Sequence, residues 1–245
     1  MTTKQKTAIV TGAGKGIGAE IALQLAADGY SIIVNYIHDQ LTAQKTITNI
    51  IENKGKAIAI QGDVSDTQMM IKLFDAAEEN FSQVTTLINN AGVMRNSTIE
   101  EASDSDFDLH SQVNFGSTFR GMREAAKRLS DKGRIINISS SVVGLYQPSY
   151  GLYAASKAAI EAMTPVLAKE LAPKGITVNT VSPGPIETDF LTAGKSDELI
   201  QKIIQSIPLG RLGTPNDIAA IVSFLAGPDS GWITGQTIRA NGGAI

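Results

Sequence analysis

The sequence contains no cysteine and only two histidines, His38 and His110, among its 245 residues. The absence of cysteine excludes disulfide bonds, thiol catalysis and cysteine-ligated metal sites. Two histidines argue against a zinc centre and against a histidine-based triad, so we expect no metal site. An excess of basic residues is also missing, because 21 Lys and Arg face 24 Asp and Glu, which gives a net charge of −3. This balance does not favour nucleic acid as a partner.

Long apolar runs are absent as well, although hydrophobic residues make up 42% of the chain. No stretch approaches the roughly 20 apolar residues that span a bilayer, so no membrane partner is expected. Residues Met1–Lys6 are polar and a strand-like run follows at once, which does not resemble a secretory signal. We therefore expect a cytoplasmic protein. No linker or short repeat divides the sequence, which favours a single domain over residues 1–245.

Short apolar runs alternate along the chain with segments of helical periodicity. Continuous rather than alternating apolar runs are typical of a parallel sheet covered by helices on both faces. The pattern predicts strands at residues 7–10, 31–36, 56–61, 84–88, 134–138, 176–181 and 236–239. It predicts helices at residues 19–27, 39–53, 66–80, 104–129, 153–171 and 216–226, the fourth of them interrupted by Gly116 and Gly121. The expected fold is a doubly wound, Rossmann-type parallel sheet of about seven strands in three α/β/α layers.

Two segments depart from this simple rhythm. Residues 186–207 are polar and helix-like without a strand signal, and we expect them to form a lid over the substrate. Pro165 lies inside the helix predicted for residues 153–171 and lacks the amide hydrogen that would bond the Glu161 carbonyl. It should kink the helix or distort it locally.

A glycine-rich turn, Thr11–Gly18, separates the first predicted strand from the first helix. Glycine permits a tight turn and lets the backbone approach a pyrophosphate at a helix N-terminus. The spacing fits G-x-G-x-x-A starting at Gly14 and equally T-G-x-x-x-G-x-G starting at Thr11. A phosphate-loop NTPase is excluded, because Gly14-Lys15 is followed by Gly16 rather than by Ser or Thr. The turn therefore predicts a dinucleotide cofactor.

The end of the second predicted strand bears on which nicotinamide cofactor is used. An acid at this position would bond the ribose 2′-hydroxyl and repel a 2′-phosphate. The strand ends instead in Asn35-Tyr36, while Lys15 offers a cation and His38 a donor. Asp39 is close, but its position suggests the start of the next helix. We expect NADP(H) in preference to NAD(H).

Tyr153 and Lys157 lie four residues apart where a helix is predicted, so they share one helical face. Three serines, Ser139–Ser141, follow the strand that precedes this helix. A phenol, an ammonium and hydroxyls from a strand end can together transfer protons. Alone, however, the Y-x-x-x-K spacing is common and fits an ordinary surface pair.

Several motifs occur together in one order along the whole chain. They are Thr11-Gly12-x-x-x-Gly16-x-Gly18, Asp63-Val64, Asn89-Asn90-Ala91-Gly92, Asn114, the serines, Tyr153-x-x-x-Lys157, Pro183-Gly184 and Ile233-Thr234-Gly235. In this combination the chain resembles the short-chain dehydrogenase/reductase family. Within that family it is most similar to the bacterial enzymes grouped with 3-oxoacyl-(acyl-carrier-protein) reductases.

The glycine turn and the resemblance together imply a set of site residues. The catalytic residues would be Asn114, Ser140, Tyr153 and Lys157. The cofactor would contact Gly12, Gly14, Lys15, Gly16, Ile17, Gly18, Asn35, Tyr36, Asp63, Val64, Asn90, Ala91, Gly92, Tyr153, Lys157, Pro183, Gly184, Ile186 and Thr188. The serine is open: spacing from the strand and from Tyr153 favours Ser140, whereas spacing from Val142-Val143-Gly144 favours Ser141.

A free tyrosine titrates near ~10, and Lys157 together with the oxidised cofactor should lower the pKa of Tyr153. The resemblance implies that NADPH delivers hydride to a ketone while Tyr153 protonates the oxygen, Ser140 bonds it, and Lys157 with Asn114 relays the replacement proton. The substrate would be a 3-oxoacyl thioester or a similar carbonyl. An alcohol or polyol dehydrogenase of the same family is one alternative, and a non-catalytic NADP-binding sensor is another.

Two kinds of protein partner are also expected, an acyl-carrier protein and further copies of this chain. An acyl-carrier protein is a candidate partner, and Lys174, Arg128 and Lys132 could meet it near the site entrance, although Asp131 stands where a cation would serve better. The resemblance further implies a homotetramer built through the helices predicted at residues 104–129 and 153–171 and through the last strand.

Overall fold

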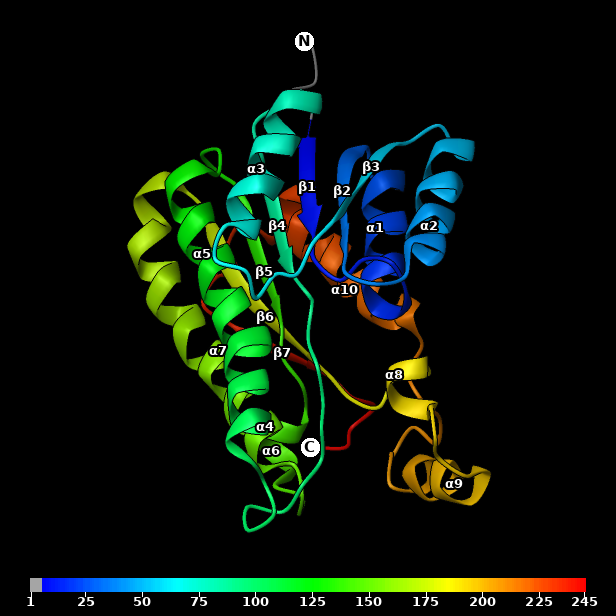
Figure 1. Cartoon of the computed structure of the whole chain (residues 1–245). Helices are drawn as coiled ribbons and strands as arrows, with labels where there is room; N and C mark the ends of the chain where they lie inside the picture. The colour runs from blue at the N-terminus through cyan, green and yellow to red at the C-terminus, as the bar shows by residue number, and fades with distance from the viewer. Residues whose placement is uncertain (1–5) are drawn as a thin grey trace.

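Parallel strands form the centre of the molecule, as the computed structural model of residues 6–245 shows (Figure 1). Residues Met1–Gln5, which contribute to the expectation about a secretory signal, lie outside the described residues. The seven strands form one sheet in the order β3-β2-β1-β4-β5-β6-β7, and every neighbouring pair is parallel. The predicted doubly wound α/β fold is therefore confirmed. No helix within residues 6–245 is long and apolar enough to cross a membrane.

The observed strands follow the predicted ones closely. They are β1 (Lys6–Val10), β2 (Tyr30–Tyr36), β3 (Lys56–Gln61), β4 (Thr86–Asn89), β5 (Arg134–Ile138), β6 (Thr177–Pro183) and β7 (Thr237–Ala240). The larger helices are α1 (Gly16–Ala27), α2 (Gln40–Glu52), α3 (Met69–Asn80), α5 (Ser117–Arg128), α7 (Gly151–Leu171) and α10 (Pro215–Ala226). The shorter segments are α4 (Asp104–Leu109), η1 (His110–Gly116), α6 (Val142–Leu145), α8 (Asp189–Thr192) and α9 (Asp197–Gln205).

Helices cover both faces of the sheet and bury two separate apolar layers. Side chains of α1, α2 and α10 pack on one face, and those of α3, α5 and α7 pack on the other. Successive strand residues point to opposite faces. Ala8 and Val10 therefore join the first layer while Ile9 joins the second. This two-sided burial explains why β1, β2 and β4 contain continuous apolar runs.

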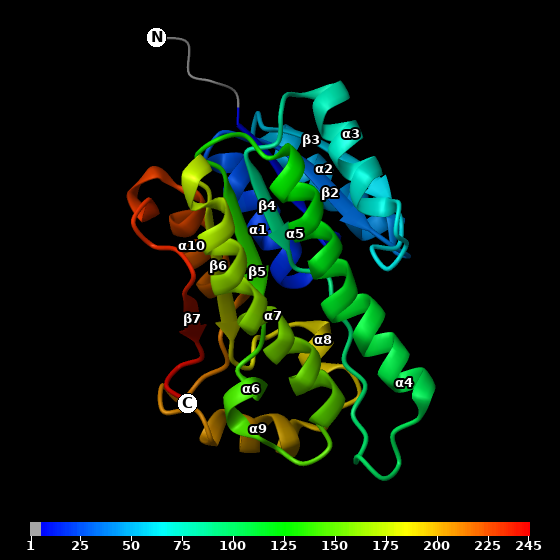
Figure 2. The ribbon, with the colours of Figure 1, turned by 90° about the vertical axis from the view of Figure 1, so that its left-hand side faces the viewer.

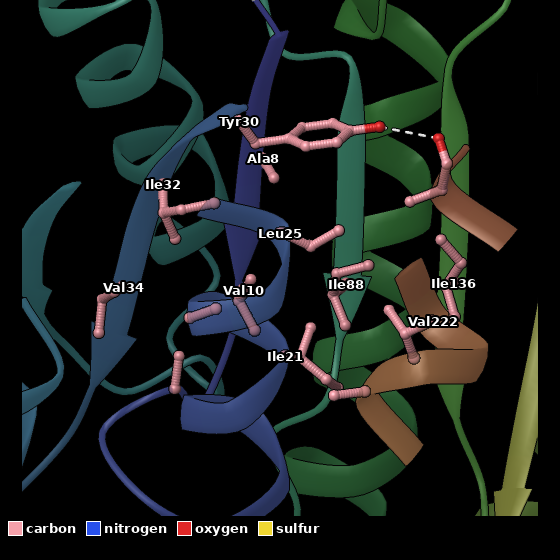
Figure 3. Close-up of a cluster of buried hydrophobic side chains, with 14 of the residues drawn as sticks. Ala8, Val10, Ile21, Leu25, Tyr30, Ile32, Val34, Ile88, Ile136 and Val222 are labelled. Atoms are coloured by element: carbon pink, nitrogen blue, oxygen red, sulfur yellow. Dashed lines mark hydrogen bonds between the residues drawn. The ribbon is translucent and has the colours of Figure 1, made fainter. Parts of the chain in front are cut away.

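Tyr30 shows how a polar group is accommodated in the first layer (Figure 3). Its ring packs among Ala8, Leu25 and other buried side chains, and its hydroxyl donates to the Ala226 carbonyl at 2.8 Å. A buried hydroxyl without a partner would destabilise the fold by about 1–3 kcal/mol. This bond fixes the end of α10 against the start of β2.

The carboxyl ends of the strands all point toward the end of the molecule that holds α4, α6, α8 and α9 (Figures 1 and 2). In open α/β sheets, ligands bind at this end, where the loops after the strands converge. The motifs from the glycine turn to Pro183-Gly184 lie at such strand ends, in the loops after them or in the helices that follow, whereas Ile233-Thr234-Gly235 precedes β7 at its amino end. The fold therefore brings together segments far apart in the chain.

The segment predicted as one helix over residues 104–129 is interrupted in an unexpected way. It is helical throughout, but the turn from His110 to Gly116 is a π-helix between α4 and α5. Gly121 does not interrupt it. A Cβ at Gly121 would lie 2.2 Å from Asn89 Oδ1, so this glycine makes room for a buried amide on β4.

Two other helix expectations have clear outcomes. Asp39 is the N-cap of α2, and its carboxylate accepts from Thr42 N at 3.0 Å. The helix predicted from Asp66 begins only at Met69, because the Asp66 carboxylate accepts from Gln68 N and closes a separate turn. α7 continues through Pro165, and the kink or local distortion expected at this proline stays a prediction.

Candidate active site

The glycine turn joins β1 to α1 and leaves its backbone open to a ligand. Gly12 and Gly16 adopt positive φ angles of 62° and 59°, a region that other residues rarely adopt. A Cβ at Gly18 would lie 2.4 Å from the Gly12 carbonyl oxygen, whereas one at Gly14 would make only ordinary contacts. The geometry therefore follows the T-G-x-x-x-G-x-G spacing, and it fits the pyrophosphate of a dinucleotide at the N-terminus of α1. Ile17 packs against the core beneath the turn.

Side chains from β2 and β4 hold this turn in place. The Thr11 hydroxyl accepts from Asn90 N at 2.9 Å and from Ala91 N at 3.0 Å, and Asn90 Nδ2 donates to the Thr11 carbonyl at 2.9 Å. Asn35 is 2% exposed; its amide donates to Gly62 O at 3.0 Å and accepts from Gly12 N at 3.3 Å. The Asn35 side chain thus supports the turn and does not face the open end of the sheet, as a direct cofactor contact would require.

No acidic side chain is placed to bond a ribose at the end of β2. Asp39 is used as the helix cap described above, Tyr36 is buried at the strand end, and Lys15 is exposed at the start of α1. After β3, Asp63 is exposed and accepts from Ser65 N at 2.8 Å, while Val64 is buried. Both follow a strand end on the same side of the sheet as the glycine turn.

Tyr153 lies near the start of α7 and is 6% exposed. Burial raises its pKa to about 12, and the bond to the Ser140 hydroxyl opposes this by favouring the phenolate. The expectation that Lys157 lowers the pKa of Tyr153 is thus wrong for the protein without cofactor, because burial outweighs every favourable contact. At neutral pH Tyr153 is a protonated phenol.

The three serines after β5 have three different partners. The Ser139 hydroxyl donates to Glu161 Oε1 at 2.8 Å, and the Ser141 hydroxyl donates to the Ser182 carbonyl at 3.2 Å. Both side chains are buried. Ser140 is half-buried and is the serine whose hydroxyl bonds to Tyr153. The geometry therefore favours Ser140 over Ser141 as the group beside a substrate oxygen.

Lys157 is 3% exposed, one helical turn after Tyr153. Its Nζ donates to the Ile138 carbonyl at the end of β5 at 2.8 Å and lies 5.9 Å from the centroid of the Tyr153 ring. Burial lowers the pKa of Lys157 to about 8. The ammonium is therefore mostly protonated at neutral pH, but it releases its proton far more readily than an exposed lysine.

Asn114 is the fifth residue of the π-helix and is fully buried. Its Oδ1 accepts from Val93 N at 2.8 Å, and its Nδ2 donates to Val93 O at 2.9 Å and to the Ser156 hydroxyl at 3.0 Å. A Cβ at Gly92 would lie 3.2 Å from Asn114 Oδ1 and 3.3 Å from Lys157 Nζ. Only glycine lets the β4 loop pass between these two groups.

The loop after β6 closes the site from the other side. Pro183 O accepts from Ser141 N at 2.8 Å, and Gly184 N donates to Ala240 O at 2.9 Å. Ile186 is buried, and the Thr188 methyl group lies 3.4 Å from where a Cβ of Gly16 would be. The loop thus reaches the glycine turn. Across residues 6–245, no three His, Cys, Asp or Glu side chains gather to hold a metal ion.

Comparison with known proteins assigns this arrangement to a family. The family model described as enoyl-(acyl carrier protein) reductase matches residues 12–244. A short-chain type dehydrogenase/reductase of Picea abies is 43% identical, with 98% of this chain and 92% of that protein covered. The chain belongs to the short-chain dehydrogenase/reductase family. The resemblance expected from the sequence is confirmed.

Other members of the family extend this likeness. An NADPH-dependent aldehyde reductase-like protein of Arabidopsis thaliana is 42% identical, covering 98% of this chain and 94% of its own. A 3-oxoacyl-(acyl-carrier-protein) reductase of Staphylococcus aureus is 38% identical, covering 97% of both. The crystal structure of a short chain dehydrogenase from Burkholderia cenocepacia in complex with NADP has a TM-score of 0.93 at 35% identity, covering 98% and 97%. The chain is thus an oxidoreductase of this family.

The basic residues suggested for carrier-protein docking do not lie at the entrance of this site. Arg128 is bound by Asp75 and Glu78 at 2.7 Å each and by Glu124 at 3.4 Å. It ends α5, and Lys132 and Lys174 come just before β5 and β6, at the amino ends of the strands. The loops around Tyr153 follow the carboxyl ends. Sequence position alone could not show that these basic residues and Tyr153 lie at opposite ends of the strands.

Sequence reasoning missed one residue of the site. His110 begins the π-helix, is 1% exposed, and places its ring edge-on to that of Tyr153 with the centroids 6.2 Å apart. The sequence shows His110 only as one of two histidines. Its place four residues before Asn114 is the one signal in the sequence, because residues at this spacing share a helical face.

The assignment of Ser140 predicts different effects for two adjacent substitutions. Ser140→Ala should lower kcat for a carbonyl substrate by about a hundredfold, because one hydrogen-bond donor to the developing oxyanion is lost. Ser141→Ala, which removes a bond to the Ser182 carbonyl, should leave kcat within about threefold of the wild type and act on stability instead, as a lost buried hydrogen bond does. Steady-state kinetics of both variants checks this, and a larger loss in Ser141→Ala would reverse the assignment.

Lys157 predicts how stability depends on pH. Its pKa is about 8 in the folded chain, below the value of 10.5 for an exposed lysine. Between these two pKa values the unfolded chain holds one more proton than the folded chain does. The free energy of unfolding therefore increases as the pH rises from about 8 to about 10. Relative to Lys157→Met, the wild type should gain about 2 kcal/mol between about pH 8 and about pH 10. Urea unfolding of both proteins at the two pH values measures this, and parallel pH profiles would contradict it.

Proposed function

We propose that this protein reduces a ketone or aldehyde to an alcohol with NADPH as the reductant. The observation that carries this proposal is the placement of Tyr153: its buried phenol lies beside the Ser140 hydroxyl, and Lys157 Nζ lies 5.9 Å from the centroid of its ring. Burial raises the pKa of Tyr153 to about 12, which agrees with a protonated phenol at neutral pH. A protonated phenol at this position serves as a general acid for reduction. Oxidation of an alcohol would need the phenolate, which is scarce until a cofactor charge stabilises it.

The residues around Tyr153 suit this reaction. NADPH, when bound, supplies the hydride. As the carbonyl oxygen gains charge, Tyr153 donates its proton to that oxygen and the Ser140 hydroxyl donates a hydrogen bond to it. The proton moves from a phenol with a pKa of about 12 to the alkoxide oxygen of the product. We take the pKa of the resulting alcohol to be close to that of bulk water, ~15.7, so the transfer is favourable. Lys157, mostly protonated, is the nearest group that can return a proton to Tyr153.

In this reaction we assign a role to the backbone carbonyl of Asn114 and not to its side-chain amide. Both Nδ2 hydrogens are donated to Val93 and Ser156 and Oδ1 accepts from Val93 N, so we place a relay past Lys157 on the backbone of the π-helix and a water molecule. Thr118 already donates to the Asn114 carbonyl at 2.9 Å, and that oxygen has a second lone pair.

NADP(H) is favoured over NAD(H) by the charges near β2. Asp39 is engaged as a helix cap, so no carboxylate there is free to select a ribose 2′-hydroxyl, and Lys15 is exposed on the glycine turn. The NADPH-dependent relative and the NADP complex of the related structure support the same choice. The cofactor would lie along the glycine turn, with its nicotinamide end at Gly92, Ile186 and Thr188.

Lys15 gives this cofactor preference a direct test. Lys15→Gln should raise KM for NADPH by roughly tenfold, equivalent to about 1.4 kcal/mol, and leave KM for NADH unchanged. Lys56→Gln is the matched control, because Lys56 is exposed at the start of β3, at the amino end of the sheet, whereas Lys15 lies beyond the carboxyl end of β1. Kinetics with both cofactors measures the change. An equal rise for NADH would show that Lys15 does not read the 2′-phosphate.

The substrate we favour is a small carbonyl compound or a free 3-oxoacyl thioester. The placement of Arg128, Lys132 and Lys174 gives no support to carrier-protein docking at this protomer's own entrance. A panel of aldehydes, ketones and 3-oxoacyl thioesters, followed by the near-ultraviolet absorbance of NADPH, tests the proposal. Turnover only of alcohols with NADP⁺ would favour the alcohol dehydrogenase alternative. Tight NADPH binding without any turnover would favour a sensor.

Assembly and the lid complete the proposed function. Apolar side chains are exposed on α4, α5 and α7, with Phe107 at 56%, Phe119 at 43% and Val166 at 56%. Trp232, just before β7, is 99% exposed. These faces are the ones we assign to a homotetramer. Residues 186–207, which contain α8 and α9, are the segment we assign to a substrate lid.

A further inference from the structure

The loop that follows β4 is held against the π-helix by side chains of two residues. Asn114 takes both backbone groups of Val93, as described above. His110 bonds the same loop two residues later: Arg95 N donates to His110 Nε2 at 3.2 Å. Three backbone groups of one loop are therefore bonded by residues four apart on η1. The loop continues to Ser97, whose N donates to Ser149 O beside the start of α7.

His110 is held in one protonation pattern by these bonds. A backbone N–H can only donate, so Nε2 is the unprotonated nitrogen and Nδ1 carries the hydrogen. Nδ1 donates to the Asp106 carbonyl at 2.8 Å. The side chains of Arg95 and Asp106 form an ion pair at 2.9 Å, so the two residues that bond the ring are also tied to each other.

The same ring supports the phenol that is to donate the proton. It lies edge-on to Tyr153 at an interplanar angle of 61°, a geometry that aromatic pairs prefer. A cavity of about 180 Å³ borders the other side of His110, lined mainly by Phe107, Phe115, Leu152 and Ala159. Without the imidazole, Tyr153 would therefore face open space on this side.

We propose that His110 is a positioning residue: it clamps the Val93–Ser97 loop together with Asn114 and fixes the Tyr153 ring for proton transfer. The proposal rests on the function proposed above for Tyr153. The two tasks are separable, since one depends on hydrogen bonds and the other on ring contact. Misplacement by even a fraction of an ångström weakens catalysis by a group that acts through geometry.

Two variants separate the tasks. His110→Phe keeps a ring beside Tyr153 and loses both hydrogen bonds, and the adjoining cavity gives the larger ring room. His110→Ala loses the ring as well. Ser111→Ala is the matched control, because Ser111 is half-buried on the same turn and borders the same cavity without touching Tyr153.

We expect kcat of His110→Ala to fall roughly tenfold while the Kd for NADPH stays within about twofold. His110→Phe should recover most of kcat but raise KM for the carbonyl substrate several-fold, because the loop is no longer clamped. A merely structural histidine would change the melting temperature and the folded fraction without this split between kcat and KM. Wild-type kcat and KM in folded His110→Ala would overturn the proposal.

Hydrogen–deuterium exchange tests the clamp without turnover or cofactor. The Arg95 amide should exchange faster in His110→Phe than in the wild type, and at the wild-type rate in Ser111→Ala. An unchanged rate in His110→Phe would overturn the clamp. If the protein turns over no carbonyl at all, the function proposed for Tyr153 fails, while faster exchange at Arg95 would still support the clamp.

Discussion

Replacing Tyr153 with phenylalanine is expected to lower kcat for carbonyl reduction by about a thousandfold, within the range that general acid catalysis supplies. The substitution removes one oxygen from a buried ring, so the fold and the contact with His110 should persist. The Kd for NADPH should remain within about threefold, since the glycine turn and Lys15 are unaffected. Stopped-flow or steady-state kinetics together with a fluorescence titration of NADPH measures both quantities.

Tyr150 provides the control for this experiment. It is a half-buried phenol three residues earlier, at the N-cap of α7, and it lies close enough to raise the pKa of Tyr153 slightly by charge repulsion. Tyr150→Phe should leave kcat within about threefold, because no proton passes through that hydroxyl. A near-normal kcat in Tyr153→Phe, or a comparable loss in Tyr150→Phe, would remove Tyr153 from the role of proton donor.

The fold could be predicted from the sequence because its rules act locally. The central strands are buried on both faces and contain apolar runs, and turn residues mark their boundaries. Asp39 was placed at the start of a helix on the same grounds, and it is the N-cap of α2. An interruption at Gly116 was expected from the sequence, but its π-helical form was not, because residues 104–129 have ordinary helical periodicity. The widened turn at His110–Gly116 coincides with bonds to a loop from another part of the chain.

The sequence predicted which residues form the site, but not how burial changes the pKa of Tyr153. Spacing brought Tyr153 and Lys157 onto one helical face, and the structure places Ser140 beside them. Without the cofactor, burial raises the pKa of Tyr153, whereas the sequence showed only the nearby charge of Lys157; the lowering expected with the oxidised cofactor bound stays a prediction. Asn35 illustrates the same limit: it lies at the expected strand end, but its amide is buried and bonded to the backbone of the turn.

Gly18→Ala should produce the second large effect, on cofactor affinity and stability together. The new Cβ would lie 2.4 Å from the Gly12 carbonyl oxygen and 2.5 Å from Asn90 Nδ2. Neither atom can move freely, because Asn90 Nδ2 bonds the Thr11 and Gly12 carbonyls. Overpacking of this kind destabilises by about 1–3 kcal/mol. At about 2–4 °C per kcal/mol, the melting temperature should fall by roughly 2–12 °C.

The same strain displaces the backbone that is to approach the pyrophosphate, so NADPH affinity should fall by about a hundredfold, equivalent to about 2.7 kcal/mol. Gly14→Ala is the matched substitution in the same turn, since its Cβ would be no closer than 3.4 Å to any neighbour. Its melting temperature should stay within about 2 °C of the wild type. Calorimetry and NADPH titration of both variants distinguish the two glycine spacings. If Gly14→Ala weakens NADPH binding more than Gly18→Ala does, the cofactor follows G-x-G-x-x-A instead, and the close packing of Gly18 serves only the fold.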